Sequence, residues 1–294
     1  MTSILQCPVC RKPLLLSADG YQCAANHAFD AAKQGYVNLL LAHKKNSREP
    51  GDNPDMVQSR RRFLDRGHYD QVSDAINRTV GSTLAGSSQG NEPRILDAGC
   101  GEGFYLKRLK DALALNTAER SAINYFGVDI SKSAVRAATQ RDKSVDWFVA
   151  SINELPFADD CLDIVLNVFS PANAAEFART LKESGSLVVV TPGPKHLNGL
   201  REVIYPVVRE HGEASIAEKT KGIFTESFVS RVTYPLELAS NQEIMDLLSM
   251  TPYFWNIDRA TKAKVEALNR LMLDVDVEIR VFRKDVHKAD AAPA

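Results

Sequence analysis

Residues 94–105 read Arg-Ile-Leu-Asp-Ala-Gly-Cys-Gly-Glu-Gly-Phe-Tyr, and the rest of the chain can be interpreted from them. Ile95 and Leu96 end a short apolar run, as in a buried parallel strand, and Asp97 follows at its carboxyl end. Three glycines at alternate positions then turn the chain into Phe104–Leu115, whose leucines have helical spacing. Glycines at such a turn let the backbone approach a ligand and present N–H groups at a helix start. The sequence therefore predicts a strand, a ligand-binding turn and a helix.

A second acidic residue lies at the end of the next predicted strand. Asn124–Asp129 is short and apolar apart from its ends, and Ser131 is placed to cap a following helix over residues 131–141. An acid at the end of the second strand of a βαβ unit is where a ribose diol is hydrogen-bonded. Asp129 is therefore expected to contact the ribose of a nucleoside-containing cofactor.

Together these features resemble the D-x-G-x-G-x-G signature of class I S-adenosylmethionine methyltransferases. The third glycine comes one residue earlier than in the G-x-G-x-x-G pattern of NAD enzymes. The resemblance implies an α/β fold, with a Rossmann-like domain built on a mostly parallel seven-stranded sheet. It also implies S-adenosyl-L-methionine as the cofactor.

Composition limits the class of protein. The chain has 294 residues, of which 44% are hydrophobic and 25% charged, as in an ordinary globular protein. No apolar run approaches the length of a membrane span, and the first residues do not resemble a signal peptide, so we expect a cytoplasmic protein with no membrane contact. The net charge of −1 gives no global nucleic-acid signature, so any RNA binding must come from local patches.

Three of the five cysteines lie near the N-terminus in a metal-binding pattern. Cys7, Cys10, Cys23 and His27 follow the spacing C-x2-C-x12-C-x3-H. Two ligands from each of two tight turns make a tetrahedral site of the kind that zinc prefers. Because protein ligands fill all four positions, the predicted zinc is structural. The first 42 residues are therefore expected to form a small zinc-binding domain.

A basic stretch follows this domain. It contains Lys44, Lys45 and Arg48, and the next predicted helix, over residues 55–64, adds Arg60, Arg61 and Arg62. One interpretation is a solvated charged face. The other is a patch that contacts RNA phosphates, and for the cluster as a whole we favour RNA binding.

The remaining candidate site residues follow the later predicted strands. The loop after the third strand would receive the adenine ring through the backbone of Ile152; Ser151 stands where many class I enzymes carry an aspartate. Residues 167–171 end the fourth strand at the position that faces the methyl group in this fold. His196 follows the fifth strand and is either a packed helix-start residue or a cofactor contact. A final helix over residues 260–271 and an antiparallel strand over 273–282 complete the domain.

A zinc module ahead of a class I domain resembles the 23S ribosomal RNA (guanine-N1)-methyltransferase family, the RlmA or RrmA type, and its Gram-negative members more closely. The segments that carry this resemblance are the zinc ligands, the glycine loop, Gly35-Tyr-Val-Asn-Leu-Leu40, Thr191-Pro-Gly-Pro-Lys-His-Leu197 and Met250-Thr-Pro-Tyr-Phe-Trp255. The family implies zinc, S-adenosylmethionine, a homodimer, and a target guanine in a hairpin loop of domain II of 23S rRNA.

The resemblance also implies roles by position. Tyr69 and His196 match positions near the cofactor, and a loop around its methionine part is formed by Gly99, Gly101, Glu102, Gly103 and Tyr105. The sequence departs from the family's Tyr-Ala-Pro ending after the fourth strand, where Phe169-Ser-Pro stands instead. Phe169 is the candidate for stacking on the target base, and no residue is an unambiguous catalytic base.

The predicted organisation is a zinc-binding RNA-recognition module at 1–42, a basic linker with helices at 43–93, the methyltransferase domain at 94–284, and a disordered tail at 285–294. Two other function classes remain open. A small-molecule methyltransferase, acting on a quinone or metabolite, would leave the zinc module and arginines without a purpose. A non-catalytic RNA-binding protein would not need an intact glycine loop with Asp129. A zinc-dependent transcription factor is disfavoured, because a single finger precedes a large α/β domain.

Overall fold

The computed structural model describes residues 4–44, 47, 49–86, 92–115, 122–205 and 216–285. Its strands are β1 (Leu14–Leu16), β2 (Gly20–Cys23), β3 (Ala28–Asp30), β4 (Tyr36–Asn38), β5 (Arg94–Ala98), β6 (Asn124–Asp129), β7 (Asp146–Val149), β8 (Leu162–Val168), β9 (Leu181–Pro192), β10 (Phe224–Leu238) and β11 (Leu271–Lys284). Its helices are α1 (Pro54–Asp65), α2 (Asp70–Ala85), α3 (Phe104–Leu115), α4 (Lys132–Arg141), α5 (Ala174–Thr180), α6 (Asn198–Ile204), α7 (Ile216–Thr220), α8 (Asn241–Ser249) and α9 (Arg259–Glu266), with short 3-10 turns at Ala42–Lys44 and Pro252–Trp255. None of the described helices is both long and apolar enough to cross a membrane.

One large sheet organises the molecule, in the strand order β10-β11-β9-β8-β5-β6-β7-β4. The five central strands, from β7 to β9, are parallel and follow the 3-2-1-4-5 order of a doubly wound sheet. β11 lies antiparallel between β9 and β10, as its alternating pattern predicts. This class I arrangement confirms the expected fold class.

The sheet has one strand more than the seven predicted. β4 lies within the first 42 residues, yet it pairs in parallel with β7 through Tyr36 and Trp147 and the two residue pairs that follow. Tyr36 and Val37 are buried there, so the strand is held by apolar packing as well as by backbone hydrogen bonds. The segment after the zinc-binding turns is therefore an edge strand of the main sheet.

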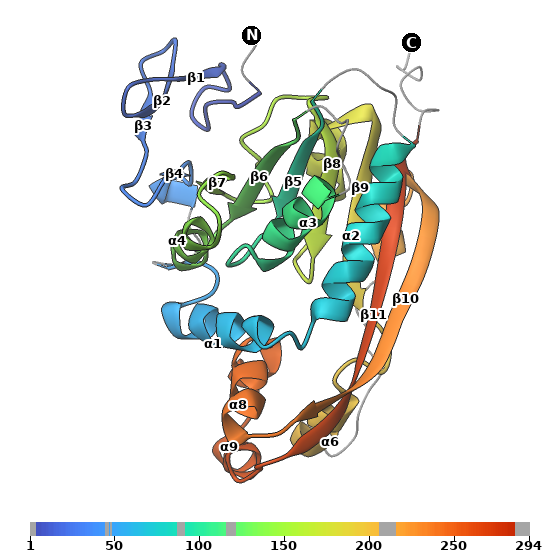
Figure 1. The fold of residues 1–294 in the computed structure, drawn as a ribbon. Coiled ribbons are helices and arrows are strands. Elements are labelled where there is room, and N and C mark those ends of the chain that lie inside the picture. The colour runs from blue at the N-terminus through green and yellow to red at the C-terminus, as the bar shows by residue number, and fades with distance from the viewer. Residues whose placement is uncertain are drawn as a thin grey trace.

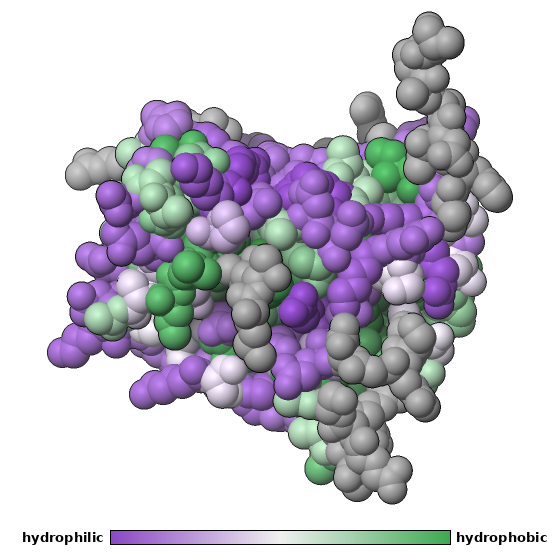
Figure 2. Space-filling model, turned by 90° about the horizontal axis from the view of Figure 1, so that it is seen from above, coloured by the Kyte–Doolittle hydropathy of each residue, from purple (hydrophilic) through white to green (hydrophobic). Residues whose placement is uncertain are grey.

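Apolar residues cover both faces of the sheet. On one face the core includes Leu106 and Leu109 of α3 together with Val72 and Ile76 of α2. On the other face it joins α5 to Leu5 and Leu14 of the N-terminal three-stranded sheet, β1-β2-β3. In Figure 1 this small sheet lies beyond the β4 edge of the main sheet. Seen from above, the surface is largely hydrophilic, with hydrophobic residues in small groups (Figure 2).

β10 and β11 extend past the central sheet and carry a separate lobe. β11 pairs with β9 only from Val277 to Arg283, but its pairing with β10 continues to Leu271. The lobe at the bottom of Figure 1 consists of α6, α8 and α9, and α1 crosses to meet α8. The predicted final helix over 260–271 is shorter, because α9 ends at Glu266 and Leu271 already pairs with Leu238. Strand pairing overrides the helical pattern there.

Candidate functional site

The N-terminal cysteines and histidine converge as predicted. The ligand atoms of Cys7, Cys10, Cys23 and His27 all lie within 4.8 Å of one another. The Cys10 and Cys23 sulfurs are 3.7 Å apart, and the Cys23 sulfur is 3.4 Å from His27 Nδ1. Zinc bound tetrahedrally at ordinary lengths would separate two sulfurs by about 3.8 Å, and a sulfur and a nitrogen by about 3.6 Å. The residues therefore fit structural zinc, held through His27 Nδ1.

The glycine loop has the backbone that its sequence requires. Gly99 and Gly103 have φ of 91° and 83°, in the left-handed region that favours glycine. A Cβ at Gly103 would lie 2.8 Å from the Trp147 ring, so α3 could not start this close to the sheet with any other residue. At Gly99 the space next to the backbone is taken by the Ser170 side chain. The loop thus lies directly against the end of β8.

Asp129 lies at the end of β6, beside this loop. One of its carboxylate oxygens accepts the Gly101 N–H at 2.9 Å, and the other accepts the Ser131 N–H at 2.8 Å. Burial raises the pKa of Asp129, while these two backbone hydrogen bonds lower it. Each oxygen keeps a free lone pair, so the carboxylate can still accept from a diol.

Asp97, at the end of β5, is a buried carboxyl group with no partner. Its exposed fraction is 1%, and neither carboxyl oxygen has a hydrogen-bond partner among the described residues. Burial, helped by the nearby Asp129, raises its pKa to about 8. An orphaned carboxyl beside a ligand-binding loop is suited to a cationic ligand group. Asp97 is the first residue of the glycine-loop motif, but the motif alone predicts no ligand contact for its side chain.

Four ring side chains form a cluster above the loop, defined here as the aromatic cluster: Tyr69, Tyr105, Phe169 and His196. The Phe169 and His196 rings stack with centroids 5.8 Å apart and an interplanar angle of 17°. Phe169 has a φ of 49°, a strained conformation for a non-glycine residue, and it is 36% exposed. One side of its ring packs on His196, while part of the ring remains open to solvent.

His196 is held by the last strand of the sheet. Its Nδ1 accepts the backbone N–H of Asp276 at 3.2 Å, and its Nε2 lies 3.2 Å from the Tyr69 hydroxyl. A neutral imidazole that accepts at Nδ1 carries its proton on Nε2, so it donates to Tyr69. Burial raises the pKa of Tyr69, which stays a neutral phenol.

Asp276 fixes the segment that carries His196. Its carboxylate is fully buried and accepts two hydrogen bonds of 2.6 Å from Arg231 and one of 2.8 Å from the Lys195 N–H. A Cβ at Gly193 would lie within 2.5 Å of this carboxylate, so the turn after β9 is fitted around it. Sequence reasoning missed Asp276, although an acid inside an alternating Val275–Val277 pattern was a possible signal.

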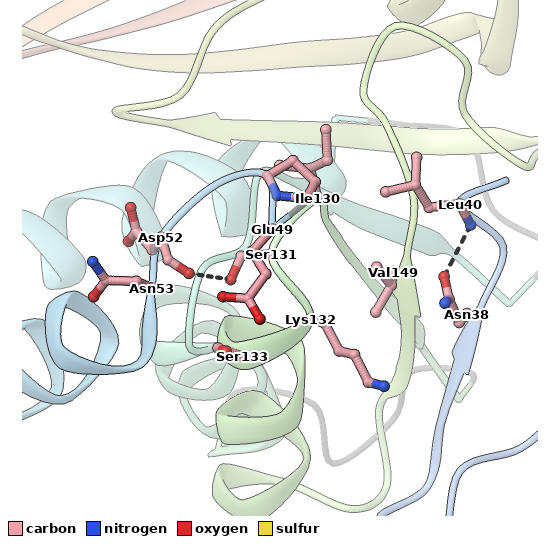
Figure 3. A pocket seen from close by; sticks show the side chains of 11 residues that line it. Asn38, Leu40, Glu49, Asp52, Asn53, Ile130, Ser131, Lys132, Ser133 and Val149 are labelled. Atoms are coloured by element: carbon pink, nitrogen blue, oxygen red, sulfur yellow. Dashed lines mark hydrogen bonds between the residues drawn. The ribbon is translucent and has the colours of Figure 1, made fainter. Parts of the chain in front are cut away.

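The segment before α1 lines a pocket beside the β6–α4 corner (Figure 3). Gly51 packs so tightly on the β6–α4 corner that a Cβ would be 2.9 Å from both Ile130 and Ser131. The Ser131 hydroxyl donates to the Asp52 carbonyl at 2.6 Å. Beneath this segment lies a cavity of about 270 Å³ that reaches Val149. The segment at residues 49–53 therefore forms one wall of this cavity, next to the corner that follows Asp129.

The arginines of α1 are partly exposed and pair with acidic side chains of the protein, so their contact with RNA stays a prediction. Arg62 binds Asp246, a carboxylate that is 1% exposed, through three hydrogen bonds of 2.5–3.2 Å. Arg60 pairs with Asp52 at 2.6 Å, and Arg61 lies 3.7 Å from Asp65. Arg60 thus joins α1 to the segment before it, and Arg62 joins α1 to α8, whereas Arg61 and Asp65 belong to the same helix.

The other predicted residues are placed as follows. Lys44 pairs with Glu154, while Lys45 and Arg48 lie outside the described residues, as do residues 286–294 of the predicted tail. Glu102 is buried and pairs with Arg141 at 2.6 Å, so its side chain turns to α4. Burial raises the pKa of Glu102 to about 7, and Arg141 opposes that rise. Ile152 packs partly buried in the turn after β7.

Comparisons with known proteins agree with this geometry. Residues 5–48 match the family described as RlmA, N-terminal, and residues 95–188 match a methyltransferase domain. YxjB of Bacillus subtilis is 31% identical over 96% of this chain and 98% of its own, and a protein of Micromonospora griseorubida is 34% identical over 95% and 96%. Both are named for 23S rRNA (guanine-N1) methylation. The 23S rRNA (guanine(748)-N(1))-methyltransferase of Streptomyces fradiae is 33% identical over 86% of each chain.

Proposed function

The chain belongs to the 23S rRNA (guanine-N1)-methyltransferase family, and from this premise we propose that it methylates N1 of a guanine in 23S rRNA. The observation that carries the proposal is the aromatic cluster beside the glycine loop. It provides a stacking surface at the sheet edge where class I enzymes bind the methyl donor. A zinc module ahead of that domain is the second feature shared with the family.

S-adenosyl-L-methionine supplies an activated methyl group, so the protein has mainly to position and desolvate the reactants. We assign its ribose to Asp129, its adenine to the backbone near Ile152, and its methionine part to the glycine loop with Tyr105. Asp97 is assigned to the ammonium group, because both of its carboxyl oxygens are buried without a hydrogen-bond partner among the described residues. The Ser170 side chain lies directly against Gly99 of the same loop.

The target guanine is assigned to the open part of the Phe169 ring. Single-stranded loops can release a base for stacking on an aromatic side chain. Tyr69 accepts a hydrogen bond from His196, so its own hydroxyl proton is available to a ligand acceptor. The N1 proton of guanine must leave during the reaction, before or together with methyl transfer.

The organisation follows from the same proposal. Residues 1–42 would contribute RNA recognition, 43–93 the linker, and 94–284 the catalytic domain. The enzyme would act in the cytoplasm as a homodimer on a hairpin loop of domain II, as the family resemblance implies. Light scattering of the purified protein measures the oligomeric state.

The decisive experiment is methylation of unmodified 23S rRNA with labelled S-adenosylmethionine, followed by primer extension. N1-methylguanine blocks Watson–Crick pairing, so one stop in the domain II hairpin is expected, and its position identifies the guanine. Cofactor binding with no label in any rRNA would reject the proposal and favour a small-molecule substrate.

A further inference from the structure

Four exposed cations on one side of the molecule have no ion-pair partner among the described residues. They are Lys33 in the turn before β4, Lys132 and Arg136 on α4, and Lys143 just after α4. The arginines of α1, in contrast, are all paired with acidic side chains. An exposed lysine or arginine without an acidic partner keeps its full charge available to an anion.

α4 aligns these side chains. Lys132 and Arg136 are four residues apart and so lie on the same side of the helix. The opposite side of α4 is buried through Ala134, Val135 and Ala138. The cations therefore point to solvent along a helix of ten residues, a length of about 15 Å.

Two hollows lie at the ends of this line. Lys33 and Lys143 line one of about 230 Å³, together with Thr139 and Trp147. The neighbouring Gly35 has nothing within 4 Å of where its Cβ would stand, so the rim of this hollow is open. Lys33 of the N-terminal module and Lys143, just after α4, thus lie at one concave site.

Lys132 lines the other hollow, the cavity beneath the linker. Figure 3 shows the Lys132 and Glu49 side chains at this cavity, and Ser131 at its edge is only two residues from Asp129. The line of cations therefore starts beside the cofactor site and ends at the N-terminal module.

We propose that Lys33, Lys132, Arg136 and Lys143, defined here as the α4 basic stripe, bind consecutive phosphates of the RNA substrate. This proposal rests on the proposed function, and it replaces the arginines of α1 as the main phosphate contacts. A chain with a net charge of −1 needs such a local patch to attract a polyanion. The stripe directs the RNA backbone along α4, so that one strand contacts the zinc module while its neighbouring loop reaches the aromatic cluster.

The test compares two triple variants with equal loss of charge. The stripe variant is Lys33→Gln, Arg136→Gln and Lys143→Gln; Lys132 is kept because of its position beside the cofactor cavity. The control variant is Lys219→Gln, Lys221→Gln and Arg259→Gln, three exposed cations also without ion-pair partners among the described residues. Affinity for an unmodified transcript of the domain II hairpin is measured over a series of salt concentrations, and the thermal midpoint checks folding.

Loss of three phosphate contacts to a single strand should lower RNA affinity about fiftyfold at 0.15 M salt and reduce the slope of log K against log salt by about 2. The control variant should keep the wild-type slope, and both variants should bind S-adenosylmethionine normally. Equal slopes for the two variants, or a loss below tenfold in the stripe variant, would overturn the stripe. Absence of the primer-extension stop with the wild-type enzyme would instead overturn the proposed function.

Discussion

The unpartnered carboxyl of Asp97 predicts that cofactor binding releases a proton. Its pKa of about 8 means that, at pH 7, about nine molecules in ten of the cofactor-free protein carry the proton on this group. An ammonium group at hydrogen-bond distance favours the ionised carboxylate. Binding at pH 7 should then release up to about 0.9 proton.

The same linkage fixes the effect of pH on affinity. When the pH falls from 7 to 6, the dissociation constant should rise up to about ninefold, because more protein must lose the proton before binding. An α-amino group stays mostly protonated over this range, so the ligand contributes little. The raised pKa also makes the stability of the fold depend on pH. As pH rises from about 4 to about 8, the free energy of unfolding should fall, because the unfolded chain loses the Asp97 proton at a lower pH than the folded protein does.

Calorimetry with S-adenosylhomocysteine, which carries the same ammonium group, measures the release from the dependence of the heat on buffer ionisation. The Asp97→Asn variant should bind without releasing a proton and should show no pH dependence between 6 and 7. Glu102→Gln is the matched control, since Glu102 also has a raised pKa, of about 7, but is paired with Arg141. Proton release that persists in Asp97→Asn and disappears in Glu102→Gln would refute the assignment.

Further predictions concern the other supports of the site. Asp129→Ala should weaken cofactor binding by calorimetry and leave RNA binding intact; equal loss of both would indicate misfolding. Asp276→Ala should lower the free energy of unfolding, because the turn after β9 loses the hydrogen bonds that Asp276 accepts from Arg231 and Lys195; chemical denaturation with no change would contradict this role. Arg62→Met should lower it by about 3 kcal/mol, since it leaves Asp246 buried without a cation, and the double variant that also replaces Asp246 by an apolar residue should recover part of the loss. Zinc removal by a chelator should weaken RNA binding while cofactor binding persists, and simultaneous loss of both would show that the modules do not fold separately.

The features that sequence could predict are those specified by short spacings. The zinc ligands occupy two tight turns, and the glycine loop and Asp129 belong to one βαβ unit. In each case the residues needed for the chemistry lie close together in the chain, so local geometry determines their meeting. The structure places them as expected.

The features that sequence could not predict depend on pairs far apart in the chain. Arg62 meets Asp246 across 184 residues, and His196 meets Asp276 across 80. A run of three arginines is consistent with an RNA contact and with ion pairs inside the protein, and its acidic partners become visible only in the tertiary fold. β4 was not predicted, because its three residues are too few to show a periodic pattern.

The dependence of His196 on β11 has a consequence for biosynthesis. Asp276 belongs to the final strand, and it holds the turn that positions His196 against Tyr69 and Phe169. Domains fold progressively from the N-terminus during translation, so the nucleoside side of the site can form before the aromatic cluster is fixed. A nascent chain from which β11 has not yet emerged therefore lacks the contacts that hold His196 against Tyr69 and Phe169.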